Sequence, residues 1–314
     1  MKFLVTAFVA LSVSINSLLA CDVCGCGTGS TYLGIDPNYG KTMFNARFQF
    51  SQFSHPNTDL NFSQQNRVKS DHFYRTEVWT QWQMKPKWQA KLTLPFARHQ
   101  RFDMDGVSTI DGIGDVRAQV NYAILNQTDS LNKSNRQLLF IGAELGLPTG
   151  KYQQRDRYEL KLPAAFQIGK GAFSYQAFAR HVLKRQNWGV SSHVQFLYNG
   201  ENELQYRFGE QTTVATSFFY SKKVKNTLWL PSLGLRWDYY SNDVQYGITK
   251  AHTGGHVLNV SAGLDFYFSK WVLNVFGQVP VQQTLSESQP ESKSNFGFGL
   301  GYYLEARKKA MPDM

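Results

Sequence analysis

Hydrophobic and polar residues alternate with a period of two along most of this chain. In the stretch "WQAKLTLPF", apolar residues take every second position from Trp88 to Phe96, and Gln89, Lys91 and Thr93 lie between them. The same alternation recurs in "VRAQVNYAI" (116–124), "YELKLPAAFQI" (158–168) and "LNVSAGLDFYF" (258–268). Successive side chains of a β-strand point to opposite faces, so this pattern predicts strands with one apolar and one polar or charged face.

The length of these segments favours a membrane barrel over an ordinary sheet. Many run for about 10 to 14 residues, whereas a typical globular strand has about 5 to 6 and a tilted strand that crosses a bilayer about 9 to 11. Charged faces within a bilayer must point into a water-filled interior, and only a closed barrel leaves no strand edge unpaired. We therefore predict an all-β fold, a transmembrane antiparallel up-and-down β-barrel. A soluble β-sandwich or lipocalin-like barrel, with its charged face outside, is the alternative.

The connections alternate between short and long, as in outer-membrane barrels, which also have an even number of strands. Short turns are expected at 85–87, 169–171 and 269–270, and long polar loops at 54–70, 98–112, 241–255 and 283–293. Thirteen strands are expected at 42–53, 71–84, 88–97, 113–125, 137–147, 157–168, 172–184, 188–198, 211–221, 227–240, 256–268, 271–282 and 294–304. Residues 202–208 ("NELQYRF") supply the fourteenth. Twelve strands would result if two of the weaker segments were loops.

The N-terminus predicts export. Lys2, an apolar run and Ala20 form a secretory signal peptide over residues 1–20, and a retained membrane anchor is the alternative. The next segment, 21–41, is a Cys- and Gly-rich leader or plug without periodicity. The barrel is expected over 42–305 and a C-terminal tail over 306–314. Export and the strand pattern together predict the outer membrane of a Gram-negative-type bacterium.

All three cysteines of the chain, Cys21, Cys24 and Cys26, fall within the leader. Leu18–Cys21 resembles a bacterial lipobox, which would make Cys21 a lipidated N-terminus. Cleavage after Ala20 without lipidation would leave three thiols, which suit copper or zinc, although a closed zinc site needs a fourth ligand. Lipidation would leave only Cys24 and Cys26 for such a metal. A disulfide is the third reading in an oxidising compartment.

Composition narrows the classes of partner. Aromatic residues make up 15% of a chain whose mean hydropathy is only −0.38, and the formal net charge is +10. The basic residues are scattered rather than clustered, which with export argues against nucleic acid. Outer-membrane lipid, a small-molecule solute and a periplasmic partner of the leader are the expected partners. Charges on polar strand faces are candidates to line the lumen, or to fill and close it: Lys91, Arg117, Glu144, Glu159, Lys161, Arg236, Asp238 and Asp265.

Two glycine-rich motifs mark corners between strands and loops. Gly112, Gly114 and Asp115 open one strand, and Pro148, Thr149 and Gly150 close the next. Glycine permits backbone conformations and close approaches that a side chain would block, and proline removes a ladder donor where a strand ends. A structural role for both motifs is therefore expected before a binding role.

These motifs, with "YRFGEQ" (206–211) and "GQVPVQQ" (277–283), resemble exported barrels of the family named after the MetA pathway of phenol degradation. That family is distantly similar to the fatty-acid and aromatic-hydrocarbon channels of outer membranes. The resemblance covers residues 42–305 and implies an outer-membrane transporter for a small solute, hydrophobic or aromatic molecules included. The tail "LEARKKAMPDM" departs from the family's aromatic C-terminal strand end.

No catalytic constellation is visible, and we expect no enzyme. His252 and His256 in "AHTGGH" are interpreted as solvated loop residues, because two glycines argue against the helix that would align them. The predicted function is passive passage of a small solute through the barrel. The alternative is a metal-handling (copper or zinc) or structural outer-membrane barrel that uses the Cys-rich leader.

Overall fold

A computed structural model describes residues 41–55, 68–104, 106–126, 135–156, 159–285 and 289–304. The predicted signal peptide, the three cysteines and the tail lie outside the described residues. The barrel strands are β1 (Thr42–Ser54), β2 (Val68–Lys85), β3 (Trp88–Asp103), β5 (Arg117–Asn126), β6 (Asn135–Gly146), β7 (Ser174–Arg185), β8 (Trp188–Asn199), β10 (Gln211–Tyr220), β12 (Thr227–Tyr240), β15 (Gly255–Phe268), β16 (Trp271–Leu285) and β17 (Glu291–Leu304).

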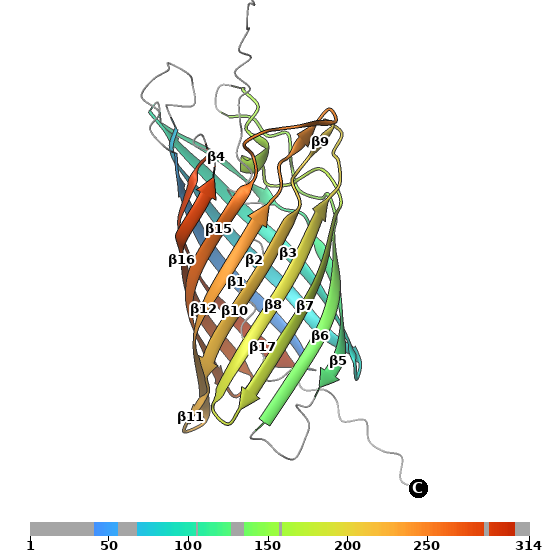
Figure 1. Cartoon of the computed structure of the whole chain (residues 1–314), viewed down its shortest axis with the longest axis vertical. Coiled ribbons are helices and arrows are strands. Elements are labelled where there is room, and N and C mark those ends of the chain that lie inside the picture. The colour runs from blue at the N-terminus through green and yellow to red at the C-terminus, as the bar shows by residue number, and fades with distance from the viewer. Residues whose placement is uncertain are drawn as a thin grey trace, which may run out of the picture.

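The described strands form one closed antiparallel barrel (Figure 1). Twelve of them pair in a ring, and pairing of β1 with β17 and of β10 with β12 leaves no open edge in the wall that the structure describes. The predicted fold class is confirmed, and the strand number is the twelve of the alternative rather than fourteen. Long connections gather at one end, which we call the loop end, and the opposite, turn end holds the first residue of β1 and the last of β17.

Two predicted barrel strands are wrong. Residues 157–168 belong to the connection between β6 and β7, where Pro163 cannot donate to a ladder and the 3-10 helix η3 (Ala164–Phe166) follows it. Leu162, Phe166 and Ile168 pack inside the mouth of the barrel instead, whereas Leu160 is exposed. In 202–208 only β9 (Tyr206–Arg207) is extended, and it pairs with β13 (Val244–Gln245) outside the barrel wall. The predicted short turn at 169–171 is accordingly the end of a long loop.

The wall of the barrel is interrupted at one of the predicted glycine motifs. The expected loop 98–112 is instead a hairpin, in which β3 extends to Asp103 and pairs with β4 (Gly106–Ile113). The expected strand 113–125 is broken between Ile113 and Arg117, where β5 begins and resumes pairing with β3. The remaining short strands are β11 (Lys222–Val224), which pairs with β12, and β14 (Ile248–Thr249), which pairs with β13.

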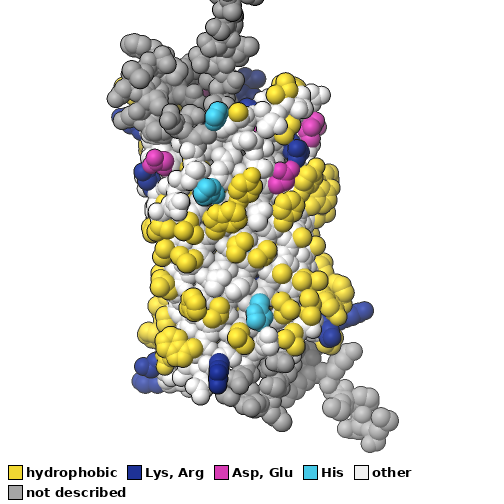
Figure 2. Space-filling model, in the orientation of Figure 1, with side chains coloured by type: hydrophobic (Ala, Val, Ile, Leu, Met, Phe, Trp, Pro, Cys, Tyr) yellow, Lys and Arg dark blue, Asp and Glu magenta, His cyan; other side chains and the backbone are white. Residues whose placement is uncertain are grey.

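The outer face of the wall carries the apolar residues, with aromatic pairs near the turn end. Hydrophobic side chains cover the visible face between charged ends (Figure 2). Four cross-strand ring pairs lie close to the turns, with centroids 4.7 to 4.9 Å apart: Trp88–Tyr122, Trp188–Tyr220, Trp229–Phe266 and Trp271–Tyr302. Such a belt with an aromatic girdle is typical of barrels in a bilayer. Among the described helices none is long and apolar enough to cross a membrane.

Inside the barrel, phenylalanines lie over glycines of the neighbouring strand. Phe178 faces Gly142, Phe219 faces Gly189 and Phe276 faces Gly297, each as a direct cross-strand partner. A Cβ atom at Gly189 would lie only 2.1 Å from the ring of Phe219. Glycine at these positions lets a large ring lie flat against the wall and fill the lumen.

We expect Gly189→Ala to lower the free energy of unfolding by about 1–3 kcal/mol, the usual cost of overpacking. Phe219 is only 2% exposed, so its ring has little room to move away. Urea unfolding of the barrel in lipid vesicles measures the change. The matched control is Gly277→Ala, where a Cβ atom would meet nothing within 4 Å. Equal losses in the two variants would show that the cross-strand ring is not responsible.

Candidate functional site

A band of buried charges crosses the middle of the lumen. We call Arg47, Glu77, Lys91, Arg117 and Glu144 the charged band; they come from β1, β2, β3, β5 and β6, which are neighbours in the wall. Glu77 accepts a hydrogen bond from Arg47 and another, of 2.6 Å, from Nη2 of Arg117. Nε of Arg117 lies 3.9 Å from Oε1 of Glu144. One carboxylate thus bridges two guanidinium groups.

Trp79 brings two cations of the band together. The guanidinium of Arg47 lies 5.4 Å from the indole centroid, and Nζ of Lys91 lies 5.3 Å from it. Lys91 is 5% exposed, and within the described part of the chain it forms no ion pair. Cation–π attraction favours each contact, although it also gathers like charges around one ring.

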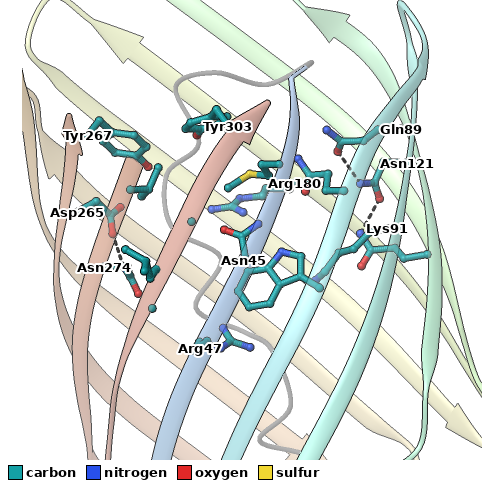
Figure 3. A pocket seen from close by; sticks show the side chains of 18 of the residues that line it. Asn45, Arg47, Gln89, Lys91, Asn121, Arg180, Asp265, Tyr267, Asn274 and Tyr303 are labelled. Atoms are coloured by element: carbon teal, nitrogen blue, oxygen red, sulfur yellow. Dashed lines mark hydrogen bonds between the residues drawn. The ribbon is translucent and has the colours of Figure 1, made fainter. Parts of the chain in front are cut away.

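Two small cavities lie on either side of the band. The lower cavity, of about 120 Å³, lies towards the turn end, and its lining includes Asn45, Lys91 and Arg180 (Figure 3). The upper cavity, of about 80 Å³, lies towards the loop end, between the band and Ile168 and Lys170. Both are lined by side chains of the polar strand faces. Space therefore remains inside the described part of the barrel on both sides of the charged band.

Apolar side chains narrow the lumen at the turn end. Below the lower cavity, inward-facing residues form a lower apolar layer: Met43, Phe219, Leu230, Tyr267, Val272 and Tyr303. Met43, Tyr267, Val272 and Tyr303 also line the cavity. The lower cavity therefore has amide and charged groups in its wall and an apolar floor.

A loop closes much of the opposite mouth. We call the β6–β7 connection, residues 147–173, the plug loop. Phe166 of η3 is 1% exposed and packs against Phe73 and His99, with ring centroids 5.7 Å away in both cases. Nδ1 of His99 donates a hydrogen bond of 2.8 Å to the backbone oxygen of Phe166. The guanidinium of Arg101 lies 4.7 Å from the same ring.

The two glycine motifs meet and hold the plug loop. Asp115 accepts hydrogen bonds from the backbone nitrogens of Gly150 (2.9 Å) and Lys170 (3.0 Å), one on each carboxylate oxygen. The hydroxyl of Thr149 donates to the oxygen of Gly114 at 3.0 Å and accepts from the nitrogen of Val116 at 2.9 Å. We call these contacts the clasp. It ties both ends of the plug loop to the break in the wall.

Close backbone packing explains why the clasp contains glycines. A Cβ atom at Gly169 would lie 2.3 Å from the oxygen of Gly150, and one at Gly150 would lie 2.8 Å from Cα of Gly169. Pro148 is exposed and lies just after β6, which ends at Gly146. Because proline has no backbone N–H, it could not continue the hydrogen-bond ladder of that strand. Gly112 is the last residue but one of β4, just before the break. The motifs were expected at corners, but their mutual contact was not.

The loop end is further tied by side chains outside the barrel wall. The hydroxyl of Tyr152 in the plug loop donates a 2.8 Å hydrogen bond to Glu203 of the β8–β10 loop, and this bond raises the pKa of Tyr152. In that second loop Tyr206 donates to the buried carboxylate of Asp243, which also accepts from the nitrogen of Gly209 at 2.7 Å. The plug loop is thus braced from two sides.

Six of the eight predicted lumen residues lie on the inner face of the wall. Lys91, Arg117 and Glu144 belong to the charged band, Arg236 donates to Asp238 at 2.6 and 2.7 Å, and buried Asp265 accepts from Asn274. The prediction that Glu159 and Lys161 line the lumen is wrong. Both are exposed in the plug loop, beside a tight turn in which Glu159 has φ 61°.

The remaining predicted site residues do not gather. His252 is exposed in a loop, and His256 lies on β15 beside Trp237 at 6.5 Å. No group of three or more His, Cys, Asp or Glu side chains within the described ranges could hold a metal ion. The cysteine candidates for copper, zinc, lipid or a disulfide lie outside those ranges.

Sequence reasoning missed Arg47 and Glu77, the core of the charged band. Both fall on the polar phase of alternating stretches, "MFNARFQF" and "YRTEVWTQW", so the signal was present. What the sequence did not contain was their pairing, which joins residues 30 positions apart.

Comparison with known proteins gives the fold. No protein-family profile and no curated protein sequence matches the chain. The COG4313 outer membrane channel from Pseudomonas putida F1 is similar in structure, with a TM-score of 0.66 and 14% identity over 86% of this chain and 100% of that one. The β domain of the Bordetella autotransporter BrkA is less similar, with a TM-score of 0.49 and 12% identity over 84% of this chain and 100% of that one. The NanC porin has a TM-score of 0.45 and 11% identity over 83% of this chain and 100% of that one. The chain therefore has the fold of an outer-membrane barrel channel.

Proposed function

We propose that this protein lies in the outer membrane and passes a small solute passively through its lumen. The observation that carries the proposal is the pair of cavities inside the barrel, with charged and amide side chains in their linings, capped by a loop that is clasped to the wall. The apolar outer belt supports a bilayer location, and the loop end would face the outside, as the long loops of such barrels do. Selection would depend on the width and charge of the path.

The finer parts of the proposal rest on the sequence. Membership of the MetA-pathway family and a hydrophobic or aromatic solute are suggested by the motifs that form the clasp. Export, lipidation of Cys21 and a metal-binding leader remain predictions about residues outside those described. The absence of enzymatic activity is likewise a prediction.

Single-channel recording in planar bilayers tests the proposal. We expect brief, small conductance steps from the wild type, because the plug loop and the charged band narrow the path. Steps should become larger when the packing of the plug is removed, and more frequent when its hydrogen bonds are loosened. A barrel that conducts in neither form is not a channel. Conductance that depends on added copper or zinc in the wild type, and not after Cys24→Ser and Cys26→Ser, would favour the metal-handling alternative.

A further inference from the structure

We propose that the lower cavity binds the carboxylate group of a small organic anion. This inference rests on the proposed function and names the class of solute that the path would hold. It is drawn from the donors, the charges and the apolar floor of that cavity.

Two buried amides in the cavity wall lack an acceptor. Asn45 and Gln89 are 8% and 2% exposed, and neither Nδ2 of Asn45 nor Nε2 of Gln89 has a hydrogen-bond partner among the described residues. Both residues line the lower cavity. A buried donor without a partner costs about 1–3 kcal/mol, so an acceptor in the cavity would be stabilised there.

The free amide of Gln89 ends an oriented chain of hydrogen bonds. Gln119 donates to Oδ1 of Asn121 at 2.7 Å, and Asn121 donates to Oε1 of Gln89 at 3.1 Å. These amides lie together on the wall formed by β3 and β5, with Lys91 beside them (Figure 3). Each step fixes the next amide, so the last N–H group is held in place as a donor.

The charged side chains that line the cavity also favour an anion. Its lining contains three cationic side chains, Arg47, Lys91 and Arg180, and one carboxylate, Asp265. Asp265 is 0% exposed and accepts a hydrogen bond from Asn274 on the wall opposite Lys91. Its charge is therefore partly satisfied, whereas Lys91 forms no ion pair with a described residue: it contacts the ring of Trp79, and the carboxylates of Glu144 and Glu77 attract it only from a longer distance. A bound anion would relieve the repulsion between Lys91 and Arg47.

The floor of the cavity favours an organic anion over an inorganic one. The lower apolar layer places Met43, Val272 and two tyrosines at the end away from the charged band. A volume of about 120 Å³ is well below the ~300–1,000 Å³ of sites for drug-sized ligands. A small organic acid therefore fits the cavity, with its carboxylate next to Lys91 and its apolar part against the lower apolar layer.

Calorimetric titration of the folded, detergent-solubilised barrel with sodium benzoate tests this proposal. We expect benzoate to bind, and benzamide, which has the same ring without the charge, to bind at least about tenfold more weakly. Lys91→Met should weaken benzoate binding at least about tenfold, a change of about 1.4 kcal/mol. The matched control is Lys222→Met, in the exposed hairpin at the turn end, which should bind as the wild type does.

A second variant keeps the test independent of whether Lys91→Met folds. Asn45→Asp conserves size and places a negative charge in the cavity, so it should abolish benzoate binding. Undetectable benzoate binding, equal binding of benzamide, or binding unaffected by both variants would overturn the inference even if the barrel conducts. Benzoate binding with the expected losses in a barrel that never conducts would uphold the site and reject passage through it.

Discussion

Replacing Glu77 with glutamine is expected to lower the free energy of unfolding by about 3–5 kcal/mol, the cost of breaking a buried ion pair. The carboxylate side chain is 2% exposed and accepts from both Arg47 and Arg117. Glutamine keeps the shape and one acceptor oxygen but removes the charge. Two guanidinium groups would then lie beside an uncharged side chain, although Glu144, 3.9 Å from Arg117, would remain.

The measurement is urea unfolding in lipid vesicles, followed by tryptophan fluorescence. An internal control is Glu291→Gln, which makes the same chemical change in an exposed pair with Lys293 whose side chains are 51% and 49% exposed. Exposed pairs contribute about 0–1 kcal/mol, so this variant should be close to the wild type. A Glu77→Gln barrel as stable as the Glu291→Gln barrel would mean that water or ions screen the charged band.

The faces of the strands were predictable because alternation is local. Lys91 and Leu92 were assigned to opposite faces from neighbouring residues alone, and the structure places Lys91 in the lumen and Leu92, 44% exposed, outside. The pairing of Glu77 with Arg117 was not predictable, because it depends on the register of strands that lie 40 residues apart in the chain. The face of a residue follows from a period of two, whereas its partner follows from the whole barrel.

Alternation also led to a wrong strand prediction where a loop segment packs on an apolar surface without pairing with the barrel wall. Leu162, Phe166 and Ile168 have the spacing of a strand, yet they pack in the mouth, and Leu160 of the same series is 51% exposed. Residues 202–208 were predicted as a strand because their residues alternate and because an even number of strands was expected. Because both assignments were wrong, the number of strands fell by two and stayed even.

The structure places the two glycine motifs at the break in the wall and just after β6, in contact with each other. Gly114 and Gly150 were expected at corners for reasons of backbone freedom. Their sequence separation of about 35 residues concealed that Asp115 joins them, since a hydrogen bond between two loops leaves no periodic signal.

Phe166→Ala is expected to raise single-channel conductance several-fold. Loss of a buried phenylalanine costs about 3–5 kcal/mol, and here the loss falls on the plug loop rather than on the wall. The ring fills the space among Phe73, His99 and Arg101, so its removal leaves a cavity in the mouth and frees η3 to move outward. Planar-bilayer recordings compare it with Leu160→Ala, an exposed leucine of the same loop that should leave the conductance unchanged.

Asp115→Asn separates loosening of the plug from loss of its packing. It removes one of the two hydrogen bonds that Asp115 accepts in the clasp, and removes the charge that strengthens the other, while Phe166 stays intact. Openings should therefore become more frequent with little change in their size. If neither variant changes the recordings, the plug loop does not limit flow. The constriction would then lie at the charged band, because Glu77 and its two arginine partners cross the path below the plug, and Glu77→Gln rather than Phe166→Ala would alter the conductance.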